Sequence, residues 1–303
     1  MYFYWRKFLH TKELISNNCF FVSDLHGSIS RYKTLFDAIM NESPAAVFMG
    51  GDLLPSGMMK LTVSFKSIHK DFINDFLAVE FGQLKKIMGE KYPEIFLILG
   101  NDDPRFEESS ILSVSTSGIW NYIHNRKIIW NEYSIYGYSF IPPTPFRLKD
   151  WEKFDVSRYT DPGCTAPYEG SHTIPVSESE LKYSTIKDDL KKLTMSDNLE
   201  KAIFLFHSPP YQTYLDRAAL DNKMIDYVPL DVHVGSIAIK RFIERNQPLL
   251  TLHGHVHEST RITGNWKDSI NKTTMLSAAY DGKELALVRF DPESPQQATR
   301  EII

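Results

Sequence analysis

Five short polar motifs, each placed directly after an apolar run of strand length, constrain the fold of this chain most strongly. Continuous apolar runs of this kind are typical of strands that are buried on both faces. The runs are Cys19–Val22, Ala46–Met49, Glu94–Leu99, Ala202–Phe206 and Pro248–Leu252. The motifs that follow them are Asp24-Leu-His26, Gly50-Gly51-Asp52, Gly100-Asn101-Asp102-Asp103, His207-Ser208-Pro209 and His253-Gly-His-Val-His257.

The segments between these runs have helical periodicity, which predicts an α/β fold built from strand-helix-strand units and a largely parallel sheet. The expected helices are 30–40, 70–88 and 236–245. Alternating apolar residues predict hairpin strands over 131–140 and a further strand over 283–290, hence a second sheet of mixed direction. We expect the tail after Asp291 to be frayed. The motifs lie beyond the carboxyl ends of the strands, where open α/β sheets hold their ligands.

The length of 303 residues allows one large domain or two smaller ones, and the even rhythm of elements favours one domain over 1–303. The stretch 141–175 departs from this rhythm, because it carries six prolines and several aromatic residues. Irregular loops of this length inside a compact domain are usually functional, so we expect a lid or insertion here.

Charge and cysteine content narrow the classes of function. The formal net charge is -4, and the basic residues are scattered, which argues against a nuclease that grips long nucleic acid. Cys19 and Cys164 are far apart and fit neither a disulfide framework nor a thiolate metal site, so a reducing cytoplasm is the simplest location. The aromatic start, 1–10, lacks an apolar signal region, and no stretch approaches a membrane span.

The residue types in the five motifs are those of a hydrolytic site with two metal ions. Asp24 and His26 are two positions apart at a strand end, where an extended backbone would send both side chains to one side. The Asp52 carboxylate has two oxygens and can bridge two cations. Imidazole, carboxylate and amide ligands without thiolate suit Mn, Fe, Zn or Ni. Alone, each residue has a commoner explanation as a cap, a turn residue or a buried histidine. The ordered combination is what indicates a metal site.

The order of motifs resembles the calcineurin-like metallophosphoesterase superfamily over residues 19–290. The resemblance implies an αββα sandwich of two mixed sheets flanked by helices. It also implies a phosphoric ester hydrolase in which a hydroxide that bridges two divalent metal ions attacks phosphorus. The implied ligands of the first metal are Asp24, His26, Asp52 and His257, and those of the second are Asp52, Asn101, His207 and His255. Two divalent ions keep such a site positive and attractive to a small phosphate ester.

One residue departs from the family pattern. Many members have histidine directly after the Gly-Asn pair, where it assists phosphate binding or protonates the leaving group, whereas this chain has Asp102. A carboxylate near metal ions is a poor acid. Either the leaving group departs unprotonated, or His172 or His233 replaces the missing histidine. This departure favours a phosphodiesterase over a phosphomonoesterase or a protein phosphatase, and a non-catalytic metal-binding scaffold is the rival from another class.

The remaining candidates are residues that position or bind substrate. Arg147 and Arg217 lie in the expected loops and are candidates to clamp a substrate phosphate together with Asn101. Gly235-Ser236 opens a helix, for which an ordinary cap is the simpler explanation than anion binding. We expect His253 to be buried rather than a ligand. The candidate catalytic residues are Asp52, Asn101, Asp102 and His207.

Overall fold

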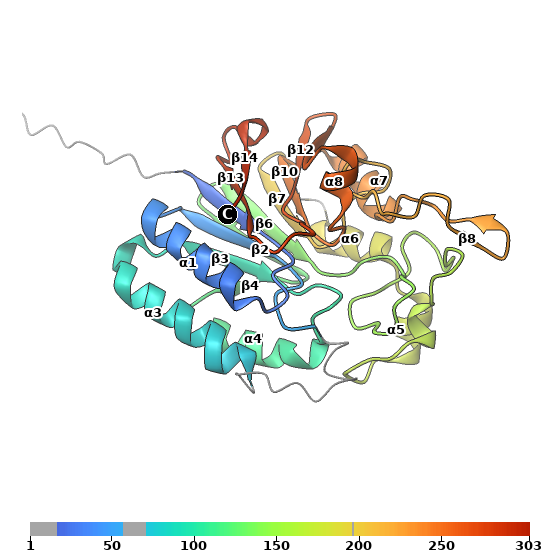
Figure 1. The fold of residues 1–303 in the computed structure, drawn as a ribbon, viewed down its shortest axis with the longest axis horizontal. Helices are drawn as coiled ribbons and strands as arrows, with labels where there is room; N and C mark the ends of the chain where they lie inside the picture. The colour runs from blue at the N-terminus through green and yellow to red at the C-terminus, as the bar shows by residue number, and fades with distance from the viewer. Residues whose placement is uncertain (1–16, 57–70, 196) are drawn as a thin grey trace, which may run out of the picture.

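Two β-sheets form the centre of the molecule, as the computed structural model in Figure 1 shows. The structure describes residues 17–56, 71–195 and 197–303. Each sheet has four parallel strands; the first sheet adds two antiparallel strands at one edge, and the second adds one antiparallel strand at each edge. The fold is therefore an α/β sandwich of two mixed sheets, as the sequence predicts.

The first sheet has the order β14-β13-β1-β2-β3-β4, and its parallel part runs from β1 to β4. Its strands are β1 (Cys19–Val22), β2 (Ala46–Gly50), β3 (Glu94–Ile98), β4 (Asn121–Tyr122), β13 (Ala286–Phe290) and β14 (Thr299–Ile302).

The second sheet has the order β11-β12-β10-β7-β6-β5, and its parallel part runs from β12 to β6. Its strands are β5 (Arg126–Trp130), β6 (Tyr133–Tyr138), β7 (Ala202–Phe206), β10 (Leu250–His253), β11 (Lys267–Ile270) and β12 (Thr273–Ser277). A separate two-stranded hairpin is formed by β8 (Met224–Ile225) and β9 (Val228–Pro229).

Helices cover the outer faces of the sandwich, with α1, α3 and α4 beside the first sheet and α6 and α7 beside the second (Figure 1). The α-helices are α1 (Ile29–Glu42), α3 (Ala78–Met88), α4 (Glu108–Ser115), α5 (Glu178–Tyr183), α6 (Ile186–Thr194), α7 (Ile237–Asn246) and α8 (Ser259–Thr263). The π-helix η1 (Ile73–Leu77) precedes α3, and short 3-10 turns are η2 (Gly89–Lys91), η3 (Arg105–Glu107), η4 (Pro167–Glu169) and η5 (Pro295–Gln297).

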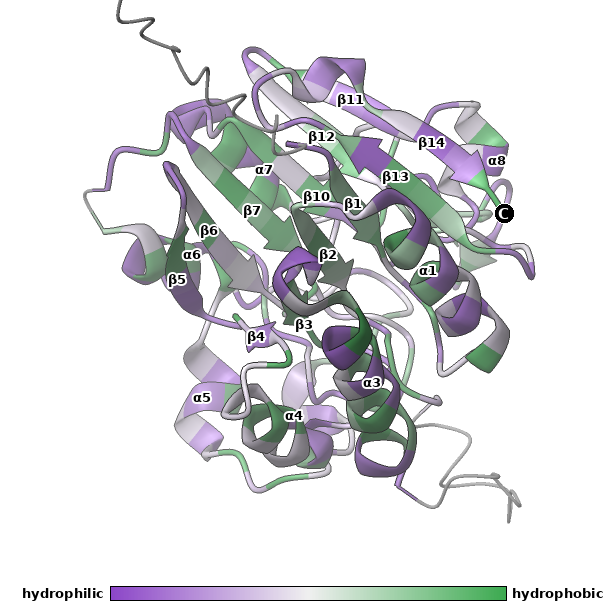
Figure 2. Ribbon diagram, turned by 90° about the vertical axis from the view of Figure 1, so that its left-hand side faces the viewer, coloured by the Kyte–Doolittle hydropathy of each residue, from purple (hydrophilic) through white to green (hydrophobic). Residues whose placement is uncertain are grey.

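The apolar strands divide their side chains between two core layers, because neighbouring residues of a strand point to opposite faces. In β1, Phe20 and Val22 join the layer beneath the helices, whereas Cys19 and Phe21 join the layer between the sheets. Other central strands alternate in the same way, and Figure 2 shows them as the most hydrophobic part of the ribbon. Burial on both faces explains why these strands are continuous apolar runs.

Helix α1 illustrates how the sequence sets the local structure. Ser28 caps its start by accepting a hydrogen bond from the Arg31 amide. Tyr32, Leu35 and Phe36 are among its buried residues, and their spacing of three or four positions makes one apolar stripe against the sheet.

The predicted elements agree with the structure except at their margins. The predicted helix over 70–88 corresponds to η1 and α3, and its predicted first residue, Lys70, lies outside the described residues, as does the N-terminal stretch 1–10. Strand β6 lies within 131–140, and its hairpin partner β5 precedes that range.

The prediction of a frayed tail after Asp291 was wrong. Strand β14 pairs antiparallel with β13, and the Ile303 and Leu285 backbones exchange two hydrogen bonds. Arg289 also bonds to Glu42 and Glu301. The polar sequence Thr-Arg-Glu-Ile lacks an apolar pattern because this strand lies at the edge of the sheet, where most of its side chains are exposed.

The stretch 141–175 is irregular, as predicted. Apart from isolated bridges, η4 is the one element with regular hydrogen bonding within it. Lys149 and Glu152 form a fully buried ion pair inside the stretch. In the part of the chain that the structure describes, no helix is long and apolar enough to cross a membrane, and Cys19 and Cys164 are free thiols.

Candidate metal centre

The candidate ligands come from both sheets and meet at the carboxyl ends of their strands. In the first sheet, Asp24 and His26 follow β1, Asp52 follows β2 and Asn101 follows β3. In the second sheet, His207 follows β7, and His255 and His257 follow β10. A site of this kind joins the two layers of the sandwich.

Four of these side chains converge closely enough to hold one metal ion. One ligand atom from each of Asp24, His26, Asp52 and His257 lies within 4.8 Å of the others. The two Nε2 atoms of His26 and His257 are 3.2 Å apart, and His257 Nε2 is 3.2 Å from Asp24 Oδ1. This group matches the first ligand set that the resemblance implied.

A second group of candidate ligands also lies close to Asp52. His207 Nε2 is 2.9 Å from Asn101 Oδ1 and 3.4 Å from Asp52 Oδ2. The rings of His207 and His255 have centroids 5.2 Å apart. Asp52 therefore lies against both groups, which is the position a bridging carboxylate requires.

Hydrogen bonds orient two of the histidines with Nε2 toward the centre. His207 Nδ1 lies 2.8 Å from the Gly50 carbonyl oxygen, which only accepts, so Nδ1 donates to this oxygen and the ring presents Nε2 to the centre. His26 Nδ1 lies 3.2 Å from Asp102 Oδ2, which orients it in the same way. Partners of this type fix the tautomer of histidines that bind metals.

The backbone at the ligands is turned rather than extended. Asp24, His26, Asp52 and His255 have positive φ angles of 57°, 46°, 52° and 74°. The expectation that an extended strand end brings Asp24 and His26 to one side was therefore wrong in its geometry, although both side chains do meet. Bonds from the amides of Asp24 and His26 to the carbonyls of Gly51 and Asp52 hold the turn, and such strained backbone is concentrated at functional sites.

Two glycines are required by the close approach of the ligand loops. A Cβ at Gly51, where φ is +92°, would lie 2.7 Å from His207 Nδ1. A Cβ at Gly100 would lie 2.4 Å from Asp52 Oδ1. Both positions therefore exclude any side chain, because real Cβ contacts are longer.

The carboxylates of the site are held in their charged form. Burial alone would raise the pKa of Asp24, but the hydrogen bond from His257 and the histidine charges bring it well below its usual range. Burial also opposes ionisation of Asp52, but the neighbouring His207 lowers its pKa to about 2. The carboxylate oxygens of Asp24 and Asp52 are therefore negatively charged at neutral pH and can bind cations.

The histidines divide into two kinds. Burial disfavours the charged forms of His26 and His207, yet Asp102 raises the pKa of the first to about 9, and Asp52 raises that of the second to about 9. Burial and the His207 charge lower the pKa of His255 to about 3. Protons therefore occupy part of the centre where metal cations would otherwise balance the carboxylates.

Comparison with protein families decides the identity of the chain. The model of the calcineurin-like phosphoesterases matches residues 19–259, which include every candidate ligand. The chain belongs to this family. Its members are phosphoester hydrolases, and the cluster of aspartate and histidine side chains agrees with the divalent metal binding that the family suggests.

Solved structures with this phosphoesterase fold are similar over nearly the whole chain. One crystal structure has a TM-score of 0.58 at 13% identity, covering 94% of this chain and 98% of the other. TT1561 of Thermus thermophilus has a TM-score of 0.53 at 14% identity, with the same coverage. A novel archaeal phosphodiesterase is a more distant neighbour, with a TM-score of 0.40 at 8% identity, covering 94% and 99%. No curated protein sequence matches the chain.

Asp102 stands where many phosphoesterases of this family have histidine, and its hydrogen bonds are committed to the centre itself. Its Oδ2 lies against His26 Nδ1, and its Oδ1 accepts a bond from Ser56 at 2.7 Å. Its amide donates to Asp52 Oδ1 at 2.7 Å. Asp102 therefore links candidate ligands from two loops.

The sequence analysis missed the role of the next residue, Asp103. Its buried carboxylate accepts bonds from the amides of Leu53, Leu54 and Gly100, so it joins the loop after β2 to the loop after β3. Burial and the Asp52 charge raise its pKa to about 7 despite these donors. The sequence signal that could have indicated this role is its position within the Gly-Asn-Asp-Asp motif.

Among the described residues, no hydrogen bond or ion pair joins the arginine candidates to the ligand cluster. Arg147 is exposed. Arg217 donates to the Ala218 carbonyl and pairs with Asp221, within its own loop. Their role as substrate clamps stays a prediction.

The helix start at Ser236 is occupied by side chains of this chain. Ser236 accepts a bond from the Ile239 amide, and the Asp155 carboxylate accepts bonds from Ser236 Oγ and from the amides of Ile237 and Ala238. The simpler explanation of an ordinary cap is confirmed. His253 is buried, as expected, between the Ser208 carbonyl and the Thr251 hydroxyl.

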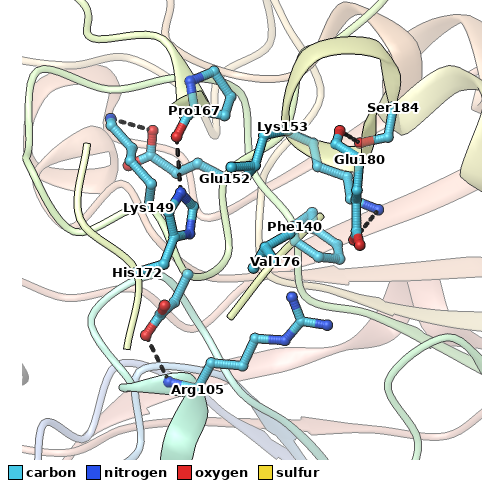
Figure 3. A pocket seen from close by; sticks show the side chains of 12 residues that line it. Arg105, Phe140, Lys149, Glu152, Lys153, Pro167, His172, Val176, Glu180 and Ser184 are labelled. Carbon is cyan, nitrogen blue, oxygen red and sulfur yellow. Dashed lines mark hydrogen bonds and ion pairs between the residues drawn. The ribbon is translucent and has the colours of Figure 1, made fainter. Parts of the chain in front are cut away.

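His172 lines a small pocket beside Arg105, Lys149 and Lys153, as Figure 3 shows. Its Nε2 bonds to the Pro167 carbonyl at 2.9 Å, and its Nδ1 is buried without a partner. The pocket holds about 10 Å³, which is room for about one water molecule, and none of the candidate ligands lines it. This environment does not suit an acid that must reach a substrate.

Proposed function

We propose that this calcineurin-like phosphoesterase holds two divalent metal ions and hydrolyses a small phosphodiester. The observation that carries the proposal is the pair of ligand groups that share Asp52. Asp52 clusters with Asp24, His26 and His257, and it also lies close to His207, which contacts Asn101.

The residues present fit such a centre by their chemistry. The donors are carboxylate, imidazole and amide, and no thiolate is among them. This set suits Mn, Fe, Zn or Ni. Asp24 and Asp52 are charged, and hydrogen bonds direct His26 and His207 with Nε2 inward. We propose Asp24, His26, Asp52 and His257 for the first ion, and Asp52, Asn101, His207 and His255 for the second.

A pair of divalent ions held by these residues would lower the pKa of a bound water molecule and would neutralise charge that develops on the phosphate. The chain contributes the positioning. Asp103 joins the loops of Asp52 and Asn101, and the glycines at 51 and 100 let them approach. Asn101 also has an amide nitrogen that can donate to a phosphate oxygen.

Diester hydrolysis is favoured over monoester hydrolysis by the commitment of Asp102. Its two oxygens lie against the candidate ligand His26 and the Ser56 hydroxyl, so it has no free position from which to protonate a leaving group. A diester carries one negative charge less than a monoester, so it gains less from a histidine at this position. The alternative of a phosphomonoesterase or protein phosphatase predicts the opposite substrate preference.

We further propose that residues 1–303 form one domain in which the segment 141–175 borders the substrate site as a lid. Trp151 Nε1 donates to the Asp103 carbonyl at 2.9 Å, and Asp150 Oδ2 accepts from the Arg105 amide at 2.8 Å. The segment is thereby attached to the loop that carries Asn101.

The test compares bis-p-nitrophenyl phosphate with p-nitrophenyl phosphate, using metal-stripped protein reconstituted with Mn²⁺. We expect a preference for the diester. Asp52→Asn should reduce the rate by about 10²–10³-fold, because loss of a shared ligand removes several kcal/mol of transition-state stabilisation. Asp37→Asn, at an exposed position of α1, is the matched control and should retain the wild-type rate.

Other outcomes distinguish the alternatives. A preference for the monoester would contradict the diesterase assignment. Turnover of neither ester by protein that holds two metal ions would favour the non-catalytic scaffold, the rival that this chain disfavours because it keeps all seven candidate ligand positions.

A further inference from the structure

A second pair of acidic and imidazole side chains lies in the loop that begins at His207. His233 Nδ1 is 2.8 Å from Asp216 Oδ1. Asp216 is fully buried, whereas 27% of the His233 side chain is exposed. The two residues are 17 positions apart, so the fold rather than the local sequence brings them together.

Asp216 is held rigidly. Its carboxylate accepts bonds from the amides of Gln212 and Thr213 at 2.8 and 2.9 Å, and from the Gly235 amide at 3.2 Å. It is therefore an oriented acceptor that faces His233 from a fixed position. A carboxylate of this kind keeps the proton of an imidazole on Nδ1 and directs Nε2 outward.

The outward nitrogen of His233 is uncommitted. Among the residues that the structure describes, none has a hydrogen bond to Nε2. Asp216 bonds to the ring, the Asp231 carboxylate accepts from the His233 backbone amide, and the Tyr211 ring packs across the imidazole with centroids 6.1 Å apart. Arg217, which forms a backbone bridge with His233, is paired with Asp221.

The loop that carries this pair is attached to the segments that follow two candidate ligands. After His207, the Pro209 carbonyl accepts from the Ser236 amide, three residues beyond His233. After His257, Glu258 Oε1 accepts from the Ala219 amide at 3.0 Å. Arg217 and His233 form an antiparallel bridge between these two attachments. The pair is thus fixed on the side of the molecule where the ligand loops lie.

From this geometry we propose that His233, oriented by Asp216, is the general acid that protonates the leaving group. The proposal rests on the proposed phosphodiesterase function. As water attacks phosphorus, the bond from phosphorus to the leaving oxygen breaks and its electron pair stays on that oxygen. His233 Nε2 gives its proton to this oxygen, the attacking water loses a proton to solvent, and the neutral imidazole regains a proton from solvent.

Two features separate His233 from His172, the other histidine that the sequence suggested. His172 uses Nε2 on a backbone carbonyl, its Nδ1 is buried without a partner, and it lines the small pocket of Figure 3. His233 has a buried carboxylate on Nδ1, and its side chain is partly exposed, with no hydrogen bond to Nε2 among the described residues. Only the second arrangement can deliver a proton to a substrate.

The test is the dependence of rate on the leaving group, measured with methyl p-nitrophenyl phosphate and methyl phenyl phosphate. The two diesters differ only in how much the departing oxygen needs a proton. His233→Asn is the chosen variant, because its amide nitrogen can replace Nδ1 toward Asp216 while Nε2 is removed. We expect the phenyl ester to lose about 10²-fold or more and the nitrophenyl ester to lose much less.

The controls separate this proposal from the function on which it rests. His172→Gln should lose neither activity, because glutamine retains a donor for the Pro167 carbonyl. If the wild type hydrolyses neither ester, the proposed function fails. If the wild type is active and His233→Asn reduces both rates equally, or neither, the general-acid role is overturned.

A second measurement needs no turnover. Mn²⁺ is paramagnetic and broadens the NMR signals of nearby nuclei, so titration with Mn²⁺ should broaden the imidazole signals of His233. Unbroadened His233 signals in protein that has bound Mn²⁺ would place the ring too far from the centre and overturn the proposal.

Discussion

At the scale of single residues, the contacts of Asp102 explain how this phosphoesterase dispenses with a histidine after its Gly-Asn pair. The carboxylate bonds to His26 and to Ser56 instead of facing substrate. The residue therefore acts through a candidate ligand. If His233 supplies the proton, the two tasks that one histidine combines in many relatives are divided between two side chains.

The role of Asp102 predicts a change in metal affinity. Asp102→Ala should weaken binding of Mn²⁺ about 10- to 100-fold, because partners of this kind orient ligating histidines. Asp102→Asn should retain more affinity, since its carbonyl oxygen can still accept from His26. Isothermal titration of metal-free protein with Mn²⁺ measures both. Equal affinity of the wild type and the alanine variant would show that His26 needs no such partner.

At the scale of elements, the irregular segment 141–175 gains its shape from a buried ion pair instead of from regular hydrogen bonding. Lys149 Nζ is 2.5 Å from Glu152 Oε2, with the side chains 0% and 1% exposed. Thr144 completes the cluster, because its amide and hydroxyl donate to Glu152 and its carbonyl accepts from Lys149. Burial raises the pKa of Glu152 although the lysine opposes this.

Breaking this pair should destabilise the protein strongly. Glu152→Ala leaves the Lys149 charge buried and should cost about 3–5 kcal/mol of unfolding free energy, measured by urea denaturation. The double variant Lys149→Met/Glu152→Leu removes both charges and should recover most of the loss. The control is Glu178→Ala in the exposed pair with Lys182, which should change stability little. A double variant as unstable as the single one would contradict this account.

At the scale of the whole molecule, the candidate centre connects the two sheets. Asp24, His26, Asp52 and Asn101 extend from the first sheet, and His207, His255 and His257 extend from the second. A metal ion that both sets hold can bind only to the folded protein, because the two sets are far apart in the unfolded chain. Binding should therefore stabilise both sheets together.

This connection predicts a stability gain that depends on pH. In metal-free protein the pKa values of His26 and His207 are raised to about 9. Their protonation therefore stabilises the folded protein fully below pH 6.5, and this stabilisation is lost as pH rises toward 9. Metal binding displaces these protons, so Mn²⁺ should raise the melting temperature more at pH 8 than at pH 6. At 100 times its Kd, an ion adds about 2.7 kcal/mol.

Melting curves with and without Mn²⁺ at the two pH values provide the measurement. In Asp52→Asn, Mn²⁺ should raise the melting temperature much less than in the wild type at both pH values. A gain in the wild type that is larger at pH 6 than at pH 8 would contradict the displacement of protons from the histidines.

The sequence by itself determined the strands and the residue types of the centre. Runs such as Ala202–Phe206 are apolar throughout because they are buried on both faces, and that property is local enough to recognise along the chain. The same placement after strands predicted where His207 and His257 would lie. Polar ligand types in fixed order then indicated the family.

Only the tertiary structure decided which partners each residue contacts. The turned backbone at Asp24, the edge strand β14 and the His26–Asp102 contact depend on chain segments that are distant in sequence. So does the buried carboxylate behind His233. Periodicity reports the burial of a residue but not its partner, because hydrogen bonds and ion pairs form between segments that folding alone brings together.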